Sequence, residues 1–120
     1  MRLQNEMYVV TNETAEQVEI RLIAAHYIYQ AHFPGNPITP GVCIVQMIGE
    51  LLEQRTCRQL SLSRVVNLKF VSALTPTNTP EVTVKFASVQ TDDNECKAKG
   101  VLEAKGEILT KFSLVFKVKE

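Results

Sequence analysis

Residues 40–56, PGVCIVQMIGELLEQRT, constrain the fold of this chain more than any other stretch. Their apolar residues recur at three- and four-residue spacing, which is typical of a helix, and further apolar residues fill most of the remaining circumference. A helix that is apolar on most sides is stable only when the rest of the protein surrounds it. Polar residues gather from Glu53 onward, so we expect the helix to reach the surface near its end.

The other patterned segments alternate polar and apolar residues, as half-buried strands do. Before the helix, residues 16–25 show this period, and a short strand at residues 7–10 is predicted to pair with them across the polar turn TNET. Four strands are predicted after the helix, at residues 64–73, 81–90, 96–105 and 106–118. The last two are expected to form a hairpin that turns near Lys105 and Gly106. Antiparallel strands around one buried helix make an α+β architecture, in a single domain over residues 1–120.

The size and the charge of the chain limit its function classes. A length of 120 residues suits one domain with one core. Thirteen Lys plus Arg balance thirteen Asp plus Glu, so we expect no nucleic-acid partner and no acidic membrane surface. The first residues contain no apolar run of signal-peptide length, and no segment approaches the roughly 20 apolar residues that span a bilayer. A cytoplasmic protein is therefore expected.

Several polar residues and thiols are expected to be structural. Cys43, Cys57 and Cys96 are widely spaced and form no CxxC pair, which argues against a disulfide framework and against a zinc site. They are expected to be reduced and mostly buried. Asp92 and Asp93 stand in a polar turn, and the turn preference of Asp explains both without a metal.

Residues 32–42, HFPGNPITPGV, concentrate proline and glycine directly before the helix. A tight turn into a buried helix explains such residues on structural grounds. Three further details indicate a proton-transfer site. His32 stands where the rigid loop begins, the N–H groups of Gly41 and Val42 have no partner within the helix, and Gln46 is polar in an otherwise apolar run. Helix N–H groups with the positive end of the helix dipole suit a developing oxyanion.

Local roles are also predicted for the residues at the start of the helix and for the second histidine. Thr39 is expected to cap the helix, and Pro40 to occupy its first turn, where the missing N–H has no cost. His26, in a segment predicted to continue the preceding strand, is expected to be structural or exposed.

The stretch from His32 to Val42 resembles the HFPGxPxxPG signature of the 3-hydroxyacyl-[acyl carrier protein] dehydratases of type II fatty acid synthesis. Residues 67–82, NLKFVSALTPTNTPEV, resemble a later strand and proline-bearing turn of the same family. In outline the resemblance covers nearly the whole chain. It implies the hot-dog fold, in which an antiparallel sheet wraps around one long central helix.

The resemblance also implies an activity. Such enzymes are lyases that eliminate water from a 3-hydroxyacyl chain on the phosphopantetheine arm of acyl carrier protein, which leaves a trans-2-enoyl thioester. His32 would remove the proton from the carbon next to the thioester, and the backbone N–H of Gly41 would hold the thioester oxygen. Other signature residues are expected to line the substrate: Phe33, Gly35, Pro40 and Val42. No metal and no diffusible cofactor are implied, and a coenzyme A thioester stays open as substrate because its chemistry is identical.

An oligomer is implied as well. Members of the family work as dimers whose sheets join edge to edge, and each active site takes its histidine from one subunit and its acidic helix residue from the other. A homodimer is therefore expected here, with a trimer of dimers left open. Dimerisation would also cover a sheet edge that a single chain leaves open.

One position departs from the pattern of the family. The helix residue five after Gly41 is Glu or Asp in these dehydratases, whereas it is Gln46 here, and an amide cannot give up a proton at neutral pH. Four residues further, where the family commonly has Gln, this chain has Glu50, one helical turn away. Glu50 is either a displaced general acid or a polar residue near the solvated part of the helix. With no acid, His32 would act as a lone base that returns its proton to the leaving hydroxyl, which Gln46 orients.

Two functions remain. The first is a dehydratase of carrier-bound 3-hydroxyacyl chains, favoured by His32 and the intact proline-glycine turn. The second is a catalytically silent hot-dog subunit that binds acyl carrier protein or pairs with an active dehydratase partner, favoured by Gln46. A thioesterase suits the fold, but neither its acid-bearing helix nor an HGG-type turn is present.

Overall fold

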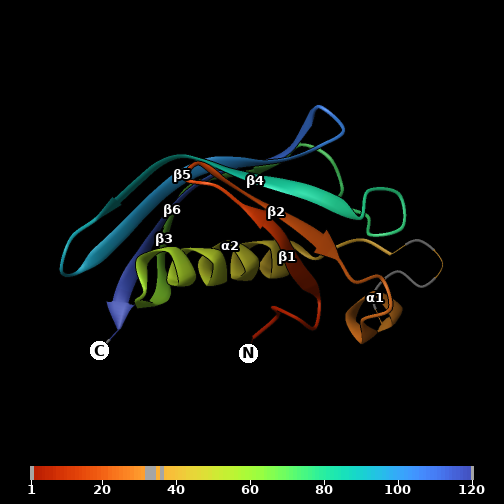
Figure 1. The fold of residues 1–120 in the computed structure, drawn as a ribbon, viewed down its shortest axis with the longest axis horizontal. Coiled ribbons are helices and arrows are strands. Elements are labelled where there is room, and N and C mark those ends of the chain that lie inside the picture. The colour runs from red at the N-terminus through yellow and green to blue at the C-terminus, as the bar shows by residue number, and fades with distance from the viewer. Residues whose placement is uncertain (1, 32–34, 36, 120) are drawn as a thin grey trace.

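The computed structural model describes residues 2–31, 35 and 37–119. Within these ranges six antiparallel strands form one sheet in the order β1-β2-β4-β5-β6-β3, and the sheet arches over helix α2 (Figure 1). The elements are β1 Tyr8–Glu13, β2 Gln17–Leu22, α1 Tyr27–Ala31, α2 Gly41–Thr56, β3 Gln59–Phe70, β4 Glu81–Thr91, β5 Glu95–Ala104 and β6 Glu107–Lys119. The predicted α+β class, a sheet wrapped around one long helix, is confirmed.

The core lies between the concave face of the sheet and one side of α2. The helix contributes Ile44, Met47, Ile48, Leu51 and Leu52, all of them buried. Side chains from successive strands meet them: Val18, Ile20, Val82, Val84, Leu102, Phe112, Leu114 and Phe116. Full burial of one such side chain stabilises a fold by about 1.5–3 kcal/mol. The apolar circumference of α2 therefore holds the sheet in its curved shape.

β-Bulges allow the sheet to curve. The strand registers shift at five places, between Val10/Asn12, Leu62/Arg64, Val65/Asn67, Phe86/Ser88 and Leu102/Glu103. Each extra residue bends its strand and increases the local twist. Opposite the bulge in β4, Gly100 lets two strands approach closely, because a Cβ atom there would lie 2.0 Å from the carbonyl oxygen of Lys85.

The first hairpin and the segment after it differ from the prediction. β1 continues through most of the predicted turn to Glu13, so the chain reverses at residues 14–16. Residues 27–31 form the short helix α1 instead of continuing a strand. His26 stabilises the start of this helix, because its Nδ1 accepts the N–H of Ile28 at 3.2 Å and its carbonyl accepts the N–H of Tyr29 at 3.0 Å. His26 thus has a structural role, at the start of a helix and not at the end of a strand.

The strands after α2 agree better with the sequence. β3 starts at Gln59, before the predicted residue 64, and the bounds of the other three agree closely. The last hairpin turns at Lys105 and Gly106, whose φ angles of 52° and 78° suit a tight two-residue turn. The hairpin prediction is confirmed.

The three cysteines differ in burial. Cys43 and Cys96 are buried, and burial raises the pKa of both thiols. Cys57 is exposed at the end of α2, so the expectation of burial fails for this one. Within the described ranges, no three His, Cys, Asp or Glu side chains come together as a metal-binding group. No helix in that part of the chain has the length and apolar character needed to cross a membrane.

We predict that Gly100→Ala destabilises the fold. The new Cβ would overlap the Lys85 carbonyl, which belongs to the backbone and moves only with its strand, so we expect a loss of about 1–3 kcal/mol in the free energy of unfolding. Urea denaturation, monitored by circular dichroism, measures this free energy of unfolding. Gly49→Ala is the matched control, because its Cβ would meet only the edge of the Phe116 ring at 3.2 Å. Equal stability of Gly100→Ala and the parent would contradict this account.

Candidate active site

The start of α2 has no side-chain cap. Pro40 is the N-cap residue, and among the described residues no side chain bonds to the helix N–H groups there. The prediction that Thr39 caps the helix is wrong, because its hydroxyl lies 2.9 Å from the hydroxyl of Tyr29. The helix also begins at Gly41 and not at Pro40. The N–H groups of Gly41 and Val42 therefore point out of the first turn, at the positive end of the dipole of a 16-residue helix.

An aromatic ring lies against this helix start. A Cβ atom on Gly41 would lie 2.7 Å from Cζ of Phe70, the last residue of β3. Phe70 pairs across the sheet with Thr110, whose wholly buried hydroxyl has no hydrogen-bond partner among the described residues. A side chain at position 41 would thus require the Phe70 ring to shift, and the helix N-terminus is bordered by an aromatic ring and by the interior of the sheet.

The other signature residues are placed only in part. Gly35 has φ of 87°, in the left-handed region that favours glycine, which explains this residue in the loop. Pro40 is half-buried, whereas 77% of Val42 is exposed. His32 and Phe33 lie outside the described residues. Their predicted roles as base and as substrate contact stay predictions.

Glu50 is a buried carboxylate with four hydrogen-bond donors. Only 1% of the residue is exposed, so the interpretation of Glu50 as a solvated residue is wrong. Oε2 accepts the N–H of Leu3 at 2.7 Å and Nε2 of Gln46 at 2.9 Å. Oε1 accepts the N–H of Gln4 at 2.9 Å and the hydroxyl of Tyr8 at 3.0 Å. Two donors on each oxygen occupy the acceptor positions of an ionised carboxylate.

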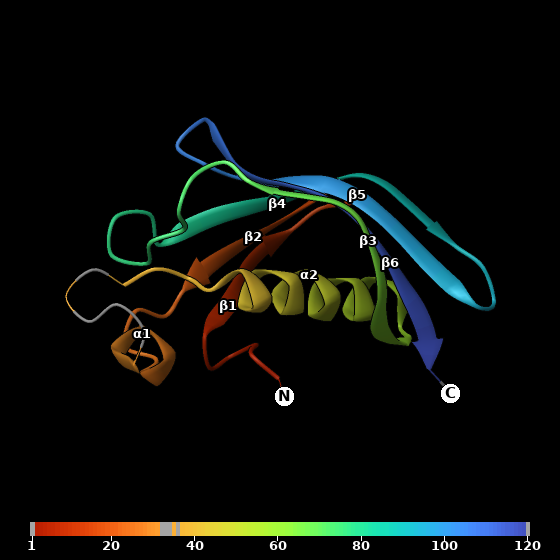
Figure 2. The ribbon, with the colours of Figure 1, turned by 180° about the vertical axis from the view of Figure 1, so that it is seen from behind.

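Three of the four donors come from a part of the chain that is distant in sequence. The residues before β1 run beneath α2, on the side away from the sheet (Figure 2), and they bring the N–H groups of Leu3 and Gln4 to Glu50. Burial and the adjacent Glu50 carboxylate raise the pKa of Tyr8 well above its usual value of 10.0. The phenol therefore keeps its proton and donates a hydrogen bond to Glu50. Glu50 therefore joins the N-terminal segment, β1 and α2.

Gln46 lies on the side of α2 that the sheet does not cover. Together with Val42, Val45, Gly49 and Glu50 it lines an open groove of about 520 Å³ between the helix and β3. Leu62 and Phe116 form the other wall. The predicted residues Gly41, Val42, Gln46 and Glu50 therefore lie along one helix, on or beside its uncovered face.

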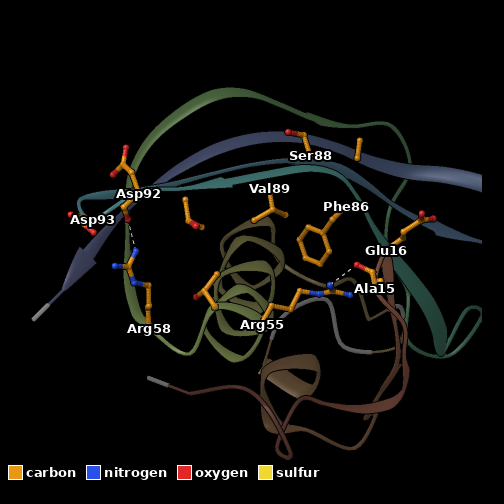
Figure 3. A pocket seen from close by; sticks show the side chains of 12 residues that line it. Ala15, Glu16, Arg55, Arg58, Phe86, Ser88, Val89, Asp92 and Asp93 are labelled. Atoms are coloured by element: carbon orange, nitrogen blue, oxygen red, sulfur yellow. Dashed lines mark hydrogen bonds between the residues drawn. The ribbon is translucent and has the colours of Figure 1, made fainter.

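A second pocket, of about 600 Å³, lies at the other end of α2 (Figure 3). Two of its polar side chains, Arg55 and Asp92, are engaged in the fold. The guanidinium of Arg55 donates to the carbonyls of Ala15 and Thr14 at 2.8 and 2.6 Å and lies 5.0 Å above the ring of Phe86. Oδ1 of Asp92 accepts the N–H groups of Asn94 and Glu95, which lowers the pKa of the Asp92 carboxyl. This pocket contains none of the predicted site residues.

Two contacts that shape the site leave no sign in the local sequence patterns. Tyr8 is separated from Glu50 by more than 40 positions, and no local spacing relates them. Phe70 belongs to a strand that was recognised, but its contact with Gly41 depends on how the sheet curves. The one signal in the sequence was an acidic residue in a mostly apolar helix. It indicated Glu50 but not the groups that donate hydrogen bonds to it.

An antiparallel sheet wrapped around one central helix defines a protein of the hot-dog class. Among solved structures, a thioesterase from Haemophilus influenzae has this fold with a TM-score of 0.65 and 13% identity, over 96% of this chain and 80% of that one. The dehydratase heterocomplex ApeI:P from Xenorhabdus doucetiae gives a TM-score of 0.58 and 16% identity, over 89% and 92%. At these identities the likeness establishes the fold alone.

The chain belongs to the ApeI-like dehydratase family, whose model matches residues 9–107. It is also similar to a 3-hydroxyacyl-[acyl-carrier-protein] dehydratase, FabZ, from Acetivibrio thermocellus, with 30% identity over 95 residues. This match covers 73% of the chain and 64% of the length of that relative. The predicted family resemblance is confirmed.

We predict that the contact between Tyr8 and Glu50 makes stability depend on alkaline pH. At neutral pH, Tyr8→Phe should cost about 1.5–3 kcal/mol, because a hydrogen bond to a charged group is lost. The folded-state pKa of Tyr8 is raised above 10.0, so its stabilisation is present below pH 10 and is lost as the pH rises further. The difference between parent and variant should shrink above pH 10 by about 1.4 kcal/mol per pH unit.

Urea denaturation at several pH values between 7 and 11 measures this difference. Tyr27→Phe is the matched control, since 67% of Tyr27 is exposed. A difference between parent and Tyr8→Phe that stays constant up to pH 11 would show that the phenol does not donate to Glu50.

Proposed function

We propose that this chain eliminates water from 3-hydroxyacyl thioesters carried by acyl carrier protein and so forms trans-2-enoyl thioesters. One observation carries the proposal: α2 begins without a side-chain cap directly after the proline-glycine turn. Its first N–H groups are thus available to an oxygen that gains negative charge, beside Phe70 and at the end of an open groove.

The thioester oxygen would accept the N–H of Gly41. Removal of a proton from C2 places negative charge on this oxygen, and a fixed donor aimed at it is commonly worth about 3–4 kcal/mol in the transition state. Val42 follows in the same turn, and Pro40 keeps the entering chain rigid. The helix dipole adds positive potential at this point.

His32 would carry the proton transfer. Its imidazole takes the proton from C2, the C2=C3 double bond forms as the C3–O bond breaks, and the same imidazole returns the proton to the departing hydroxyl, which leaves as water. Gln46 would orient that hydroxyl. A positioned general acid commonly contributes about 10²- to 10⁴-fold, so a chain without one is expected to be slower than dehydratases that have it.

A second copy would complete the site. β3 is an edge strand of 12 residues, and an exposed edge of this length pairs readily with another chain. Exposed apolar side chains lie along it and on α2: Val42, Leu62, Val65, Val66, Phe70 and Val71. A homodimer in which two β3 strands meet would cover these side chains together with the groove that contains Gln46.

The second candidate function is a hot-dog subunit that pairs with a different, active dehydratase chain. The hydrogen bonds of Glu50 favour it, since the carboxylate that accepts a hydrogen bond from Gln46 is fully engaged inside this chain. A partner subunit with an acid at the position of Gln46 would supply the missing proton donor. Carrier protein would then bind to the pair and not to the single chain.

We predict that the purified chain dehydrates 3-hydroxyacyl carrier-protein thioesters and that His32→Ala lowers the rate at least 10²-fold. Mass spectrometry of the carrier-bound acyl chain measures the loss of water, and the hydration of enoyl thioesters measures the reverse reaction. The control is His26→Asn, which keeps a residue suited to the start of α1 and should keep full activity. Activity that survives His32→Ala would rule out this mechanism; an inactive parent that gains activity with a second dehydratase chain would favour the second candidate.

We predict that Leu62→Glu converts a dimer into a monomer. Leu62 is 45% exposed in the single chain, so a charge there leaves the fold intact but would be buried without a partner in the dimer. Light scattering coupled to gel filtration gives the mass. The matched control is Lys105→Glu in the β5–β6 turn, away from the β3 edge. A monomeric parent would refute the shared site.

A further inference from the structure

Glu50 lies where its carboxylate can set the orientation of the Gln46 side-chain amide toward the groove. Oε2 of the buried carboxylate lies 2.9 Å from Nε2 of Gln46, one turn back along α2. An ionised carboxylate only accepts hydrogen bonds, so it must meet the NH₂ end of the amide. The reversed amide would place two oxygens in contact, with no proton between them.

The other contacts of Glu50 hold its carboxylate in place. The N–H groups of Leu3 and Gln4 are obligate donors, and both oxygens must accept from them. A proton on either oxygen would displace one of the four donors. Glu50 is therefore unsuited to the role of displaced general acid, which would require it to carry a proton and release it.

We propose that Glu50 is a positioning residue that presents the carbonyl oxygen of Gln46, and not its NH₂ group, to the 3-hydroxyl of the substrate. This inference rests on the proposed function. Gln46 would accept the hydrogen of that hydroxyl, which leaves a lone pair of the hydroxyl oxygen directed at the proton returning from His32. The Gln46–Glu50 pair thereby fixes the orientation of the leaving group, although it donates no proton.

Glu50→Gln tests this role with little change of volume. An amide at position 50 both donates and accepts, so it no longer dictates the orientation of Gln46. We expect kcat to fall about tenfold to 100-fold, the order of loss that a misplacement of about 1 Å brings, with KM changed little. Tyr8→Phe is the matched control, because it also removes one hydrogen bond of Glu50 but leaves the bond to Gln46 in place.

The exchanged double variant separates positioning from stability. Gln46→Glu alone puts two carboxyl groups within hydrogen-bond distance, which raises the pKa of one of them and destabilises the fold above that pKa. Gln46→Glu with Glu50→Gln restores a donor–acceptor pair in reversed order. We expect the double variant to exceed both single variants in kcat, and its kcat–pH profile to show an additional acidic group that the parent lacks.

A second measurement does not depend on activity. In ¹⁵N NMR spectra of the parent, the side-chain NH₂ of Gln46 should contain one proton shifted downfield and protected from exchange, assigned by its loss in Gln46→Met. The shift and the protection should vanish in Glu50→Gln and persist in Tyr8→Phe. If the parent shows no dehydration at all, the proposed function fails, and this spectrum still decides whether Glu50 fixes the amide.

Two kinetic results would overturn the inference. One is a Glu50→Gln variant with the kcat of the parent. The other is a loss of activity in Glu50→Gln and Tyr8→Phe that merely follows their loss of stability, with no gain in the double variant. An unprotected Gln46 amide in the parent would overturn it in either case.

Discussion

The burial of α2 is the constraint on which the rest of this structure depends. A helix with apolar residues on most of its circumference has to be enclosed, and a flat sheet would cover only a strip of it. The bulges in β1, β3, β4 and β6 bend the strands, and Gly100 lets β5 approach β4 where that bend is sharp. The curved sheet then brings Phe70, at the end of β3, against the first turn of the helix. The candidate site is a consequence of how the core is packed.

The enclosure is incomplete, and the uncovered side of α2 is where the candidate chemistry lies. Residues four apart on a helix differ by about 40° in direction, so Gln46 and Glu50 are close without being equivalent. At Gln46 the helix faces the groove, whereas at Glu50 it faces the N-terminal segment. An exchange of Glu and Gln between these positions therefore moves the carboxylate from an accessible place to a buried one. The same two residue types then give a fixed amide instead of a proton donor.

Much of the fold follows from the sequence, because the patterns that specify it are local. The helix over residues 41–56 and the hairpin at Lys105 and Gly106 depend on periodicity and on turn residues within a few positions of each other. The short helix α1 was missed because its five residues are too few to show a helical period, and because His26 supplies its start through a side chain. Threonine is a residue type that often caps helices. The hydroxyl of Thr39 contacts Tyr29 instead, because tertiary packing brings the two side chains together.

The candidate site, like the fold, could be predicted from the sequence only where local patterns specify it. The Gly41 position could be predicted, because helix N–H groups without partners follow from the start of any helix. The state of Glu50 could not, because its donors include Leu3, Gln4 and Tyr8, whose separation from the helix hides them from any local pattern. Sequence reasoning offered a solvated residue or a displaced acid, and the contacts describe a buried carboxylate that holds three segments together.

The absence of a proton donor at Gln46 has a stereochemical consequence for the proposed reaction. When an acid and a base act from two places, the proton on C2 and the hydroxyl on C3 can leave from different faces of the substrate. A single imidazole that takes one proton and returns it must reach both groups from one side. The lone-base mechanism therefore requires syn elimination, and it requires the hydroxyl to be held in one rotational state while the proton moves. A Gln46 amide fixed by a buried carboxylate meets that second requirement without any acid–base chemistry of its own.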